Sequence, residues 1–437
     1  MKKVVITGIG VVTPLGNSIE QTWGKLTKSF SGISYIEKFD SGASGLSSRI
    51  AGELKNFCPE DYISKKDILR LDPFIHYAAA AAIMAVDDAG LIRQRSGVRG
   101  QGSDAKLIRQ GSARPASRSE AWGVGGQGLE KQNAEIESLI THHSSLDSAG
   151  IVIGSSRGGL MSLEKAMEKY LSAGRPFSAY LMSSSTINMA SSYISMRFGI
   201  KGPALGISTA CASGTNAIGE AMRLVRSGEI DLAIAGGAEA PVCRLAVGGY
   251  GASGALSKRN HEPEKASRPF DMDRDGFVIA EGAGIVVLEE LSHALKRGAQ
   301  IYAEIAGYGT SSDAFHQTKP DISGEVAAIE KALKDANVSV DEVDYINAHA
   351  TSTILGDRAE AEAIKKVFGK RAQGIPVSAA KSMLGHMLAG AGAVEAAITA
   401  MSIYKGIIIP TINLENPDPD CGLSHVTSLM NKEINVA

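Results

Sequence analysis

The chain is poor in cysteine and in aromatic residues, and it carries no excess of either charge. Its 4 cysteines form no Cys-x-x-Cys pair, so neither a zinc ribbon nor a disulfide framework is expected. The 45 lysines and arginines nearly balance the 47 aspartates and glutamates, which argues against a nucleic-acid partner. No apolar run reaches the roughly 18 residues of a membrane span, and the apolar N-terminus lacks a signal-peptide cleavage site. We therefore expect a soluble, cytoplasmic protein that binds neither nucleic acid nor membrane.

Glycine and small hydrophobic residues are abundant, as in α/β enzymes with many tight strand–helix turns. The 437 residues include 49 glycines, and 44% of them are hydrophobic. Short apolar strands alternate with amphipathic helices, which predicts α/β layers. Strands are expected over residues 2–12, 149–154, 204–208, 232–235, 284–289, 301–311 and 375–378. Helices are expected over residues 75–89, 163–172, 214–227, 324–336, 357–368 and 390–404.

Residues 93–147 interrupt this alternation. They are crowded with arginine, glycine, serine and glutamine, as in RQRSGVRGQGSDAKLIRQGSARPASRSE. So long an irregular segment is unusual inside a compact domain. We expect an insertion that forms a mostly unstructured surface loop, with at most one helix near residues 129–140. It is either a basic docking loop or a dispensable, solvated insert.

A weak internal echo indicates two similar halves. GISTACASGTNAIGEAMRLVRSG is a strand, a small-residue turn and a helix, and PVSAAKSMLGHMLAGAGAVEAAITAMSIYKG repeats this plan with a longer turn. Duplicated halves place their two turns side by side near a pseudo-twofold axis. Cys211 in the first turn should then lie close to Lys381 and His386 in the second.

Cys211 is the candidate nucleophile. In STACASGT it follows an apolar strand and precedes a helix. The free N–H groups and the dipole of a helix N-terminus favour the thiolate form. The small neighbours leave room for a bulky acyl thioester. The alternative is a buried structural cysteine, which is the commoner fate of a lone cysteine.

Two histidines follow strands of the second half. His349 lies in DYINAHATSTILGD, and His386 lies in AAKSMLGHMLAGAGA. Either one alone could be an ordinary core histidine, but two of them with a lysine and a candidate nucleophile favour catalysis. A metal site is a poor alternative, because no His-Glu-x-x-His motif occurs and no acidic residue has ligand spacing to either histidine.

Four motifs resemble those of the β-ketoacyl-[acyl-carrier-protein] synthases, and most of all the type II, elongating enzymes. They are STACASG around Cys211, RPFDMDRDGFVIAEGAG at 268–284, NAHATST at 347–353 and KSMLGHMLAGAGAVE at 381–395. The resemblance implies a duplicated thiolase-like fold with five αβαβα layers, and we divide it into halves at residues 1–257 and 258–437. It also implies a homodimer that condenses malonyl-carrier protein with an acyl thioester in fatty-acid elongation, with acyl carrier protein as partner and no metal or organic cofactor.

The same resemblance implies roles for the residues of the site. Cys211 resembles the residue that accepts the acyl chain, and His349 and His386 resemble the pair that promotes decarboxylation of malonate. Loss of CO2 leaves an enolate, whose charge two N–H donors stabilise. Lys381 resembles the lysine that keeps the charge balance of the site. Glu395 resembles a structural glutamate behind it.

Further residues are assigned to binding and support. Thr351 and Thr353 are expected to bind substrate, and Asp357 is expected to support the site. Arg157 in GSSRGG stands where elongating enzymes carry an apolar residue beside the acyl pocket. We expect a guanidinium buried in the pocket wall there, and a preference for short or polar acyl groups.

The expected docking surface for the acidic carrier protein is basic. It lies in SKKDILRLDPF and comprises Lys65, Lys66 and Arg70. The alternative is a solvated helix face. The stretch Arg268–Asp275 is expected to be a structural ion-pair loop rather than a catalytic one.

The chain as given stops at KEINVA, before the G-F-G-G-T-N loop that supplies a gate and one oxyanion-hole N–H in the family. We therefore expect it to condense weakly and to expose apolar surface along Ile407–Ile412. Two other functions stay open. One is a ketosynthase of a polyketide or specialised-lipid pathway, and the other is an inactive, truncated copy that acts only as a binding partner.

Overall fold

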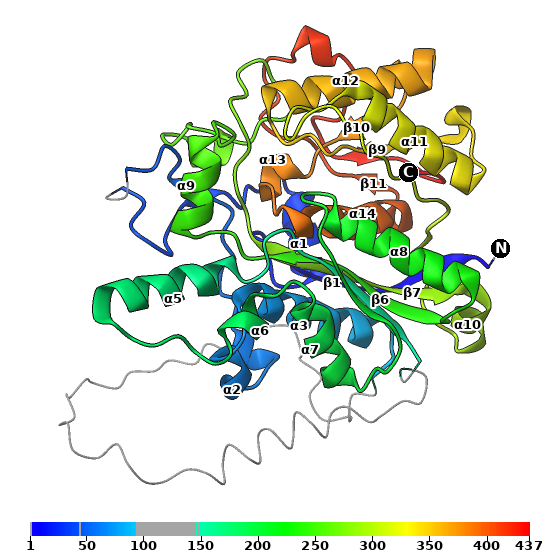
Figure 1. Cartoon of the computed structure of the whole chain (residues 1–437). Coiled ribbons are helices and arrows are strands. Elements are labelled where there is room, and N and C mark those ends of the chain that lie inside the picture. The colour runs from blue at the N-terminus through cyan, green and yellow to red at the C-terminus, as the bar shows by residue number, and fades with distance from the viewer. Residues whose placement is uncertain (1, 43–44, 93–145, 147) are drawn as a thin grey trace, which may run out of the picture.

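The computed structural model describes residues 2–42, 45–92, 146 and 148–437 (Figure 1). The insertion expected at 93–147, with its possible helix, lies outside the described residues apart from Leu146. The described residues form a six-stranded sheet, a three-stranded sheet and two two-stranded pairs, β11-β13 and β2-β3, with helices between and outside the two larger sheets (Figure 1). None of the described helices is long and apolar enough to cross a membrane.

The larger sheet has six strands in the order β5-β4-β6-β7-β1-β8. Strands β4, β5 and β6 are parallel, and β7 pairs antiparallel with both β6 and β1. Every residue of β1, β4 and β6 is buried, as expected for strands covered on both faces. The strands are β1 (Val4–Val12), β4 (Gly150–Gly154), β5 (Ala204–Ile207), β6 (Leu232–Glu239), β7 (Gly282–Glu290) and β8 (Ala303–Glu304).

Helices cover the two faces of this sheet. On one face lie α3 (Pro73–Asp88) and α7 (Met189–Phe198), and on the other lie α8 (Ser213–Ser227) and α14 (Ala389–Lys405) (Figure 1). The alanine-rich α3 packs close to β1 and β7 because its small side chains leave little space between helix and sheet.

The second sheet lies beyond α8 and α14. It consists of β9 (Ile346–Asn347), β10 (Pro376–Ser378) and β12 (Ser424–His425), and a nearby pair is formed by β11 (Ile407–Ile408) and β13 (Met430–Asn431). Helices α11 (Ile322–Ala336) and α12 (Ile354–Phe368) form the outer layer (Figure 1). The five layers are therefore αβαβα, and the predicted fold class is confirmed.

Shorter elements complete the described chain. They are α1 (Ile19–Leu26), β2 (Ser34–Tyr35), β3 (Ile50–Ala51), α2 (Lys65–Ile68), α5 (Leu160–Ala173), α6 (Leu181–Ser185), α9 (Arg244–Ala252), α10 (Leu291–Lys296) and α13 (Lys381–Leu384), with short 3-10 turns at Pro59–Asp61, Pro263–Lys265, Val340–Glu342, Gly369–Gln373 and Pro419–Cys421.

The strand predicted over Ile301–Ser311 is wrong in length. Only Ala303–Glu304 pair, and they pair with β1 of the first sheet. Farther along, the backbone lies against α11, where a Cβ on Gly309 would come within 2.0 Å of the Ala328 carbonyl oxygen. This segment packs on a helix, so it has no ladder partner there.

The expectation that Ile407–Ile412 would expose apolar surface is also wrong. Ile408 and Ile409 are fully buried. Strand β11 pairs with β13, and the Thr411 N–H donates to the Val426 carbonyl oxygen at 2.7 Å. The last residues of the chain therefore cover this edge.

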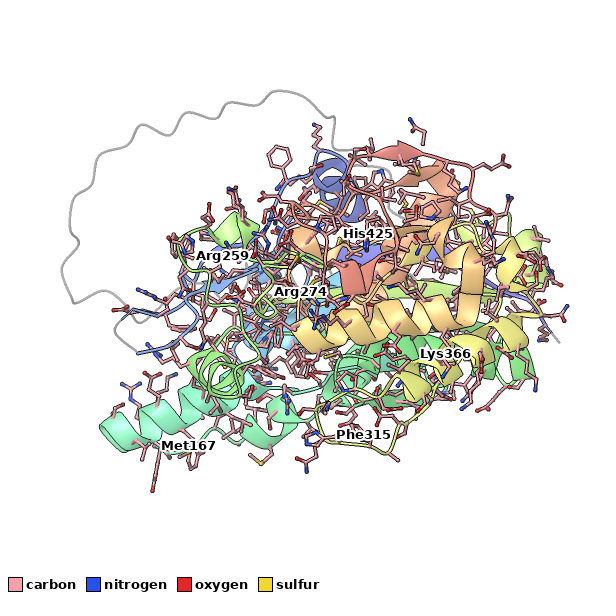
Figure 2. All side chains as sticks on the ribbon, turned by 90° about the horizontal axis from the view of Figure 1, so that it is seen from above. Met167, Arg259, Arg274, Phe315, Lys366 and His425 are labelled. Carbon is pink, nitrogen blue, oxygen red and sulfur yellow. The ribbon has the colours of Figure 1, made fainter. Side chains whose placement is uncertain are left out.

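The stretch Arg268–Asp275 is confirmed as a structural ion-pair loop. Arg268 Nε donates to Asp271 Oδ1 at 2.9 Å, and Arg274 Nη1 donates to Asp418 Oδ2 at 2.8 Å. Arg274, which is labelled in Figure 2, is buried and also donates to the Thr353 carbonyl oxygen at the start of α12. A buried pair of this kind keeps its charges only with full hydrogen bonding, so the loop is held firmly beside α12.

Two close contacts join the halves at α8 and α14. A Cβ on Gly214 of α8 would lie 2.4 Å from the Ala389 carbonyl oxygen of α14, and a Cβ on Gly392 of α14 would lie 2.0 Å from Thr215 Oγ1 of α8. Only glycine permits this approach. Because Cys211 precedes α8 and His386 precedes α14, the contact brings the two predicted turns together.

Candidate active site

Cys211 sits on a sharp turn between β5 and α8. Ala210, just before it, is left-handed with φ 50°, and the Ser213 hydroxyl donates to the Ala210 carbonyl oxygen at 2.6 Å. The same hydroxyl accepts the Thr209 N–H at 2.9 Å. This local network fixes a strained turn and projects the cysteine side chain from the end of the strand.

His386 faces Cys211 from the other half. Its Nε2 lies 3.0 Å from Cys211 Sγ. The backbone of His386 pairs like a strand with the segment after the ion-pair loop, through a donor bond to the Val278 carbonyl oxygen and an acceptor bond from the Ala280 N–H. The edge of the Phe277 ring also packs against the imidazole, with the centroids 5.3 Å apart. The motif at 268–284 therefore positions His386.

His349 is the second imidazole. Its ring centroid lies 5.3 Å from that of His386, at an interplanar angle of 87°. Its backbone N–H donates to Glu360 Oε1 at 2.6 Å, and the Ala350 N–H donates to Glu360 Oε2 at 2.7 Å. One carboxylate on α12 thus holds the loop that carries the histidine.

Lys381 lies behind this pair and is ion-paired. Its side chain is buried, and Nζ contacts Glu395 Oε1 of α14 at 2.5 Å. The Lys381 carbonyl oxygen accepts the Ser267 hydroxyl at 2.7 Å. The lysine therefore brings one positive charge into the site together with its own counterion.

Burial sets the protonation of the centre. Desolvation, aided by the positive charge of Lys381, lowers the pKa of both His349 and His386 well below the ordinary range. Of the two, His386 is buried, whereas His349 is exposed to solvent. Both imidazoles are therefore neutral at pH 7, and each carries one N–H.

The protonation state of Cys211 differs from the predicted one. Burial raises the pKa of Cys211, while Lys381, Arg157 and the Cys211 backbone N–H act in the opposite direction. The expected preference for thiolate is wrong for the resting site, because desolvation outweighs the helix terminus. The sulfur must lose its proton during the reaction, and the neutral imidazole at 3.0 Å is placed to take it.

The three groups could in principle hold a metal ion. Among the described residues, the donor atoms of Cys211, His349 and His386 lie within 4.8 Å of one another, and this donor set suits zinc. The charge of Lys381, which already disfavours protonated imidazoles, also opposes a second cation.

Arg157 does not lie in a pocket wall as a buried guanidinium. Its side chain is exposed to solvent, and its Nε donates to the Tyr250 hydroxyl at 3.0 Å. The expectation of burial is wrong because the loop after β4 turns the side chain outward across the Tyr250 ring. The guanidinium nevertheless stays close enough to Cys211 to lower the pKa of the thiol.

The threonines and Asp357 shape the loop after His349. The hydroxyls of Thr351 and Thr353 lie 3.1 Å apart, and Thr353 caps α12 by accepting the Gly356 N–H. Asp357 is fully buried and accepts N–H groups from Phe270 and Ser352. Burial raises its pKa to about 7, against the opposing effect of Arg274. Asp357 thus ties the ion-pair loop to the His349 loop.

The predicted docking residues lie on and beside the short helix α2. Lys65 and Lys66 are exposed, and the Arg70 guanidinium lies over the Tyr180 ring at 4.4 Å. Between them Leu69 is 87% exposed, so the surface presents an apolar side chain among three cations.

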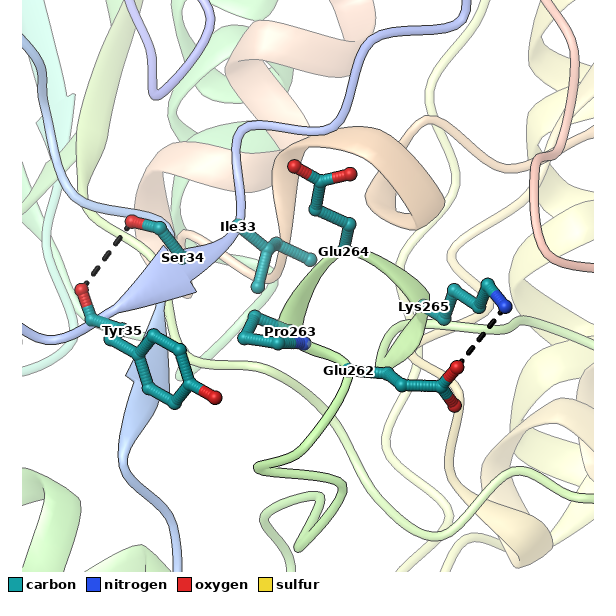
Figure 3. A pocket seen from close by; sticks show the side chains of 7 residues that line it. All are labelled: Ile33, Ser34, Tyr35, Glu262, Pro263, Glu264 and Lys265. Carbon is teal, nitrogen blue, oxygen red and sulfur yellow. Dashed lines mark hydrogen bonds and ion pairs between the residues drawn. The ribbon is translucent and has the colours of Figure 1, made fainter.

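A separate hollow of about 370 Å³ lies between β2 and the turn at Pro263–Lys265 (Figure 3). Ile33 and Pro263 form its apolar floor. Two polar contacts join its own residues, from the Ser34 hydroxyl to the Tyr35 carbonyl oxygen and from Lys265 to Glu262 (Figure 3). It contains none of the residues of the Cys211 centre.

Sequence reasoning missed Glu360, Tyr250 and Phe277. Glu360 could have been found, since it stands three residues after Asp357 and therefore on the same face of a helix. Phe277 lies inside the motif at 268–284, where the sequence assigned it no role, and Tyr250 lies outside the four motifs and carried no pattern of its own.

Two family descriptions match successive parts of the chain. Residues 1–106 and 124–294 match "Beta-ketoacyl synthase, N-terminal domain", and residues 302–415 match "Beta-ketoacyl synthase, C-terminal domain". A 3-oxoacyl-[acyl-carrier-protein] synthase 2 of Vibrio cholerae is 41% identical over 99% of this chain and 93% of its own. One of Coxiella burnetii is 41% identical over 97% and 91%.

Solved structures agree with these relatives. A β-ketoacyl synthase from Burkholderia phymatum superposes with a TM-score of 0.82 at 32% identity, covering 99% of this chain and 94% of that one. A type II polyketide ketosynthase, solved in complex with its acyl-carrier protein, has a TM-score of 0.80 at 32% identity with the same coverage.

The reactivity of Cys211 should depend on Lys381. We expect alkylation of Cys211 by iodoacetamide, followed by peptide mass mapping, to rise only above the pH at which an exposed thiol ionises, because burial raises its pKa. In Lys381→Met the profile should shift further toward alkaline pH, since the charge that lowers this pKa is gone.

Lys38→Met is the matched control for this shift. It breaks the lysine–glutamate contact of Lys38 with Glu281, also 2.5 Å long, and should leave the profile in place. An unchanged profile in Lys381→Met would show that the lysine does not act on the thiol.

Proposed function

Because the chain belongs to the β-ketoacyl synthase family, we propose that it is a 3-oxoacyl-[acyl-carrier-protein] synthase of fatty-acid elongation, acting in the cytoplasm. The observation that carries the proposal is the distance of 3.0 Å between Cys211 Sγ and His386 Nε2, which unites a nucleophile and a proton acceptor from two halves of the chain. His349 lies beside them as a second N–H donor.

The first step is acyl transfer to Cys211. Its sulfur attacks the thioester carbonyl of the acyl-carrier protein while the thiol proton passes to His386 Nε2. A new carbon–sulfur bond forms and the carbon–sulfur bond to the carrier breaks. The carrier sulfur takes the proton from His386 and leaves as a thiol. His386 thereby returns to its neutral state, which is the state that burial favours.

The second step condenses malonate with the bound acyl group. The bond between the malonyl carboxylate and its α-carbon breaks, CO2 leaves and the electron pair forms an enolate. Neutral His349 and His386 donate N–H groups to the enolate oxygen, and for this step the single proton of His386 lies on Nε2 rather than on Nδ1. The α-carbon then attacks the acyl carbonyl, and the Cys211 sulfur leaves as a thiolate while the 3-oxoacyl product forms. The thiolate takes up one proton from water and returns to the resting thiol. The scheme uses no metal and no organic cofactor.

The supporting residues balance the charge of this centre and hold its side chains in position. Glu395 compensates the charge of Lys381, and Glu360 holds the His349 backbone. Thr351 and Thr353 present hydroxyls at the same loop, where they suit the amides of a carrier-protein arm. Asp357 supports that loop from inside.

A ketosynthase of a polyketide or specialised-lipid pathway is the second candidate function. The similarity in structure to a polyketide ketosynthase favours it, because the chemistry is the same and only the acyl group differs. An inactive copy is less well supported, since the cysteine and both histidines meet in one centre.

Substitutions at the centre should separate the two steps. Cys211→Ala should abolish the acyl adduct seen by intact mass after incubation with acyl-carrier protein. His349→Ala and His386→Ala should lower CO2 release from malonyl-carrier protein by about 10²-fold, since each removes one donor to the enolate oxygen. Acylation of Cys211 should persist in His349→Ala.

His425→Ala is the control for these losses, because this histidine contacts Phe270 away from the thiol and should release CO2 at the wild-type rate. Adducts on Cys58, Cys243 or Cys421 would overturn the nucleophile assignment. Normal CO2 release in both active-site histidine variants would overturn their roles.

The surface of Lys65, Lys66, Leu69 and Arg70 is proposed as the docking site for acyl carrier protein. Its three cations suit an acidic partner, and the exposed Leu69 offers a central apolar contact. The double variant Lys65→Glu/Arg70→Glu should weaken carrier binding by at least about 10-fold at low salt, measured by titration calorimetry, because it reverses two charges.

Lys334→Glu, on the exposed face of α11 in the outer layer, should leave this affinity unchanged. Equal affinity of the double variant and the wild type at low ionic strength would remove this surface from the docking proposal.

We also propose a homodimer through the edge of the larger sheet. β5 ends the sheet and is exposed along most of its length, with Leu205 44% accessible. Beside it, Met182 of α6 and Met196 of α7 are 65% and 69% exposed. An unpaired edge flanked by apolar side chains suits pairing with a second copy.

Light scattering after gel filtration should give twice the 45.6 kDa of one chain. Leu205→Glu should shift this mass toward the monomer, whereas Leu295→Glu, at a leucine on α10 that is 62% exposed, should not. A wild-type monomer at micromolar concentration would contradict the proposed interface.

A further inference from the structure

The loop that carries Arg157 is held by the core of the protein. The fully buried carboxylate of Glu239, at the end of β6, accepts the Arg157 backbone N–H at 3.1 Å. It also accepts the Ser156 N–H at 2.7 Å and the Ser155 hydroxyl at 3.0 Å. Three consecutive residues are thus tied to one buried group, so the position of Arg157 is fixed by the core.

A short series of contacts leads from this guanidinium to the nucleophile. Arg157 lies over the Tyr250 ring, with Cζ 5.5 Å from the centroid. The edge of Tyr250 meets Phe277 at 5.5 Å, and Phe277 meets His386, the neighbour of the Cys211 sulfur. Tyr250 and Cys211 pack against the same apolar cluster. An acyl chain that extends from Cys211 along this surface would therefore reach the exposed guanidinium at its outer end.

The guanidinium has hydrogen-bonding capacity to spare. Nε is used by Tyr250, and no carboxylate of the described residues lies within ion-pair distance of Arg157. The edge formed by its two Nη groups is free to make two parallel N–H bonds. Such a planar edge matches a carboxylate in geometry and charge.

An unpaired cation beside apolar surface is unfavourable for a plain hydrocarbon chain. Methylenes placed against it gain less from burial, because the guanidinium must give up water without receiving a partner. A carboxylate on the acyl chain supplies that partner and reverses the preference.

We propose that Arg157, positioned by Tyr250, binds a carboxylate carried by the acyl group on Cys211, so that the enzyme accepts dicarboxylic half-thioesters as primers. This inference rests on the proposed function, because it concerns the acyl group that Cys211 receives. The transfer itself is unchanged: the carrier carbon–sulfur bond breaks, the Cys211 carbon–sulfur bond forms, and the distal carboxylate takes no part in the chemistry.

Matched pairs of acyl donors test the proposal. Succinyl-, glutaryl- and adipyl-carrier protein are compared with butyryl-, pentanoyl- and hexanoyl-carrier protein, so that each pair has the same length and differs in the terminal carboxylate. The rate of Cys211 acylation is read by intact mass. Wild type should favour the carboxylate of at least one pair by about 10-fold or more, as expected for a charge-assisted contact.

Arg157→Gln should reverse this preference by slowing the carboxylate donor and sparing its neutral partner. Tyr250→Phe keeps the ring and removes the acceptor for Nε, so it should weaken the preference without reversing it. Arg223→Gln is the matched control, because Arg223 also stacks on a tyrosine, Tyr308, but is paired with Glu220. It should leave every rate unchanged.

Two results would overturn the inference. If neutral donors acylate Cys211 as fast as their carboxylate partners, or if Arg157→Gln changes both donors of each pair equally, the carboxylate site is refuted while the proposed function stands. If no donor of either kind acylates Cys211, the proposed function fails and the carboxylate site fails with it.

Discussion

The close contact between α8 and α14 is the constraint on which the site depends. Each half of the chain supplies a turn followed by a helix, and neither turn is a catalytic centre alone. The helices approach so closely that the carbonyl oxygen of Ala389 occupies the space where Gly214 would carry a side chain. This approach brings a sulfur and an imidazole, 175 positions apart in the sequence, to 3.0 Å.

The second feature of the site is that it carries almost no net charge in its resting state. Two imidazoles are kept neutral by burial, a thiol is kept protonated, and the one buried lysine is matched by Glu395. Neutral imidazoles have an N–H to donate but attract no anion in the resting state. Such donors interact most strongly with charge that develops during reaction, which is the requirement for stabilising an enolate.

The sequence predicted much of this arrangement. The strand–turn–helix pattern around Cys211 and its echo around His386 predicted both turns and their meeting. The strand at residues 301–311 failed because an apolar, glycine-containing run suits a helix-packed loop as well as a strand. The predicted thiolate form of Cys211 was wrong because desolvation depends on the residues that surround the sulfur. A local motif does not contain that information.

Arg157 shows the same limit. Its place beside the nucleophile followed from the motif, but its direction depends on Glu239 and Tyr250, which lie 82 and 93 positions away. Long-range partners of this kind have no local signature. The predicted division at residue 258 also overlooked a long-range pairing. It assigns β7 to the second half, although β7 lies between β6 and β1 in the first sheet.

The most direct test of the account is the rate of Cys211 acylation in Gly214→Ala, compared with Gly24→Ala, whose added methyl group meets no atom within 4 Å. Circular dichroism and thermal melting verify that both variants are folded. The account predicts that Gly214→Ala moves α14 and His386 away from the sulfur and lowers the acylation rate by about 10²-fold, while Gly24→Ala acylates normally. A folded Gly214→Ala variant that acylates at the wild-type rate would contradict the claim that this helix contact assembles the site.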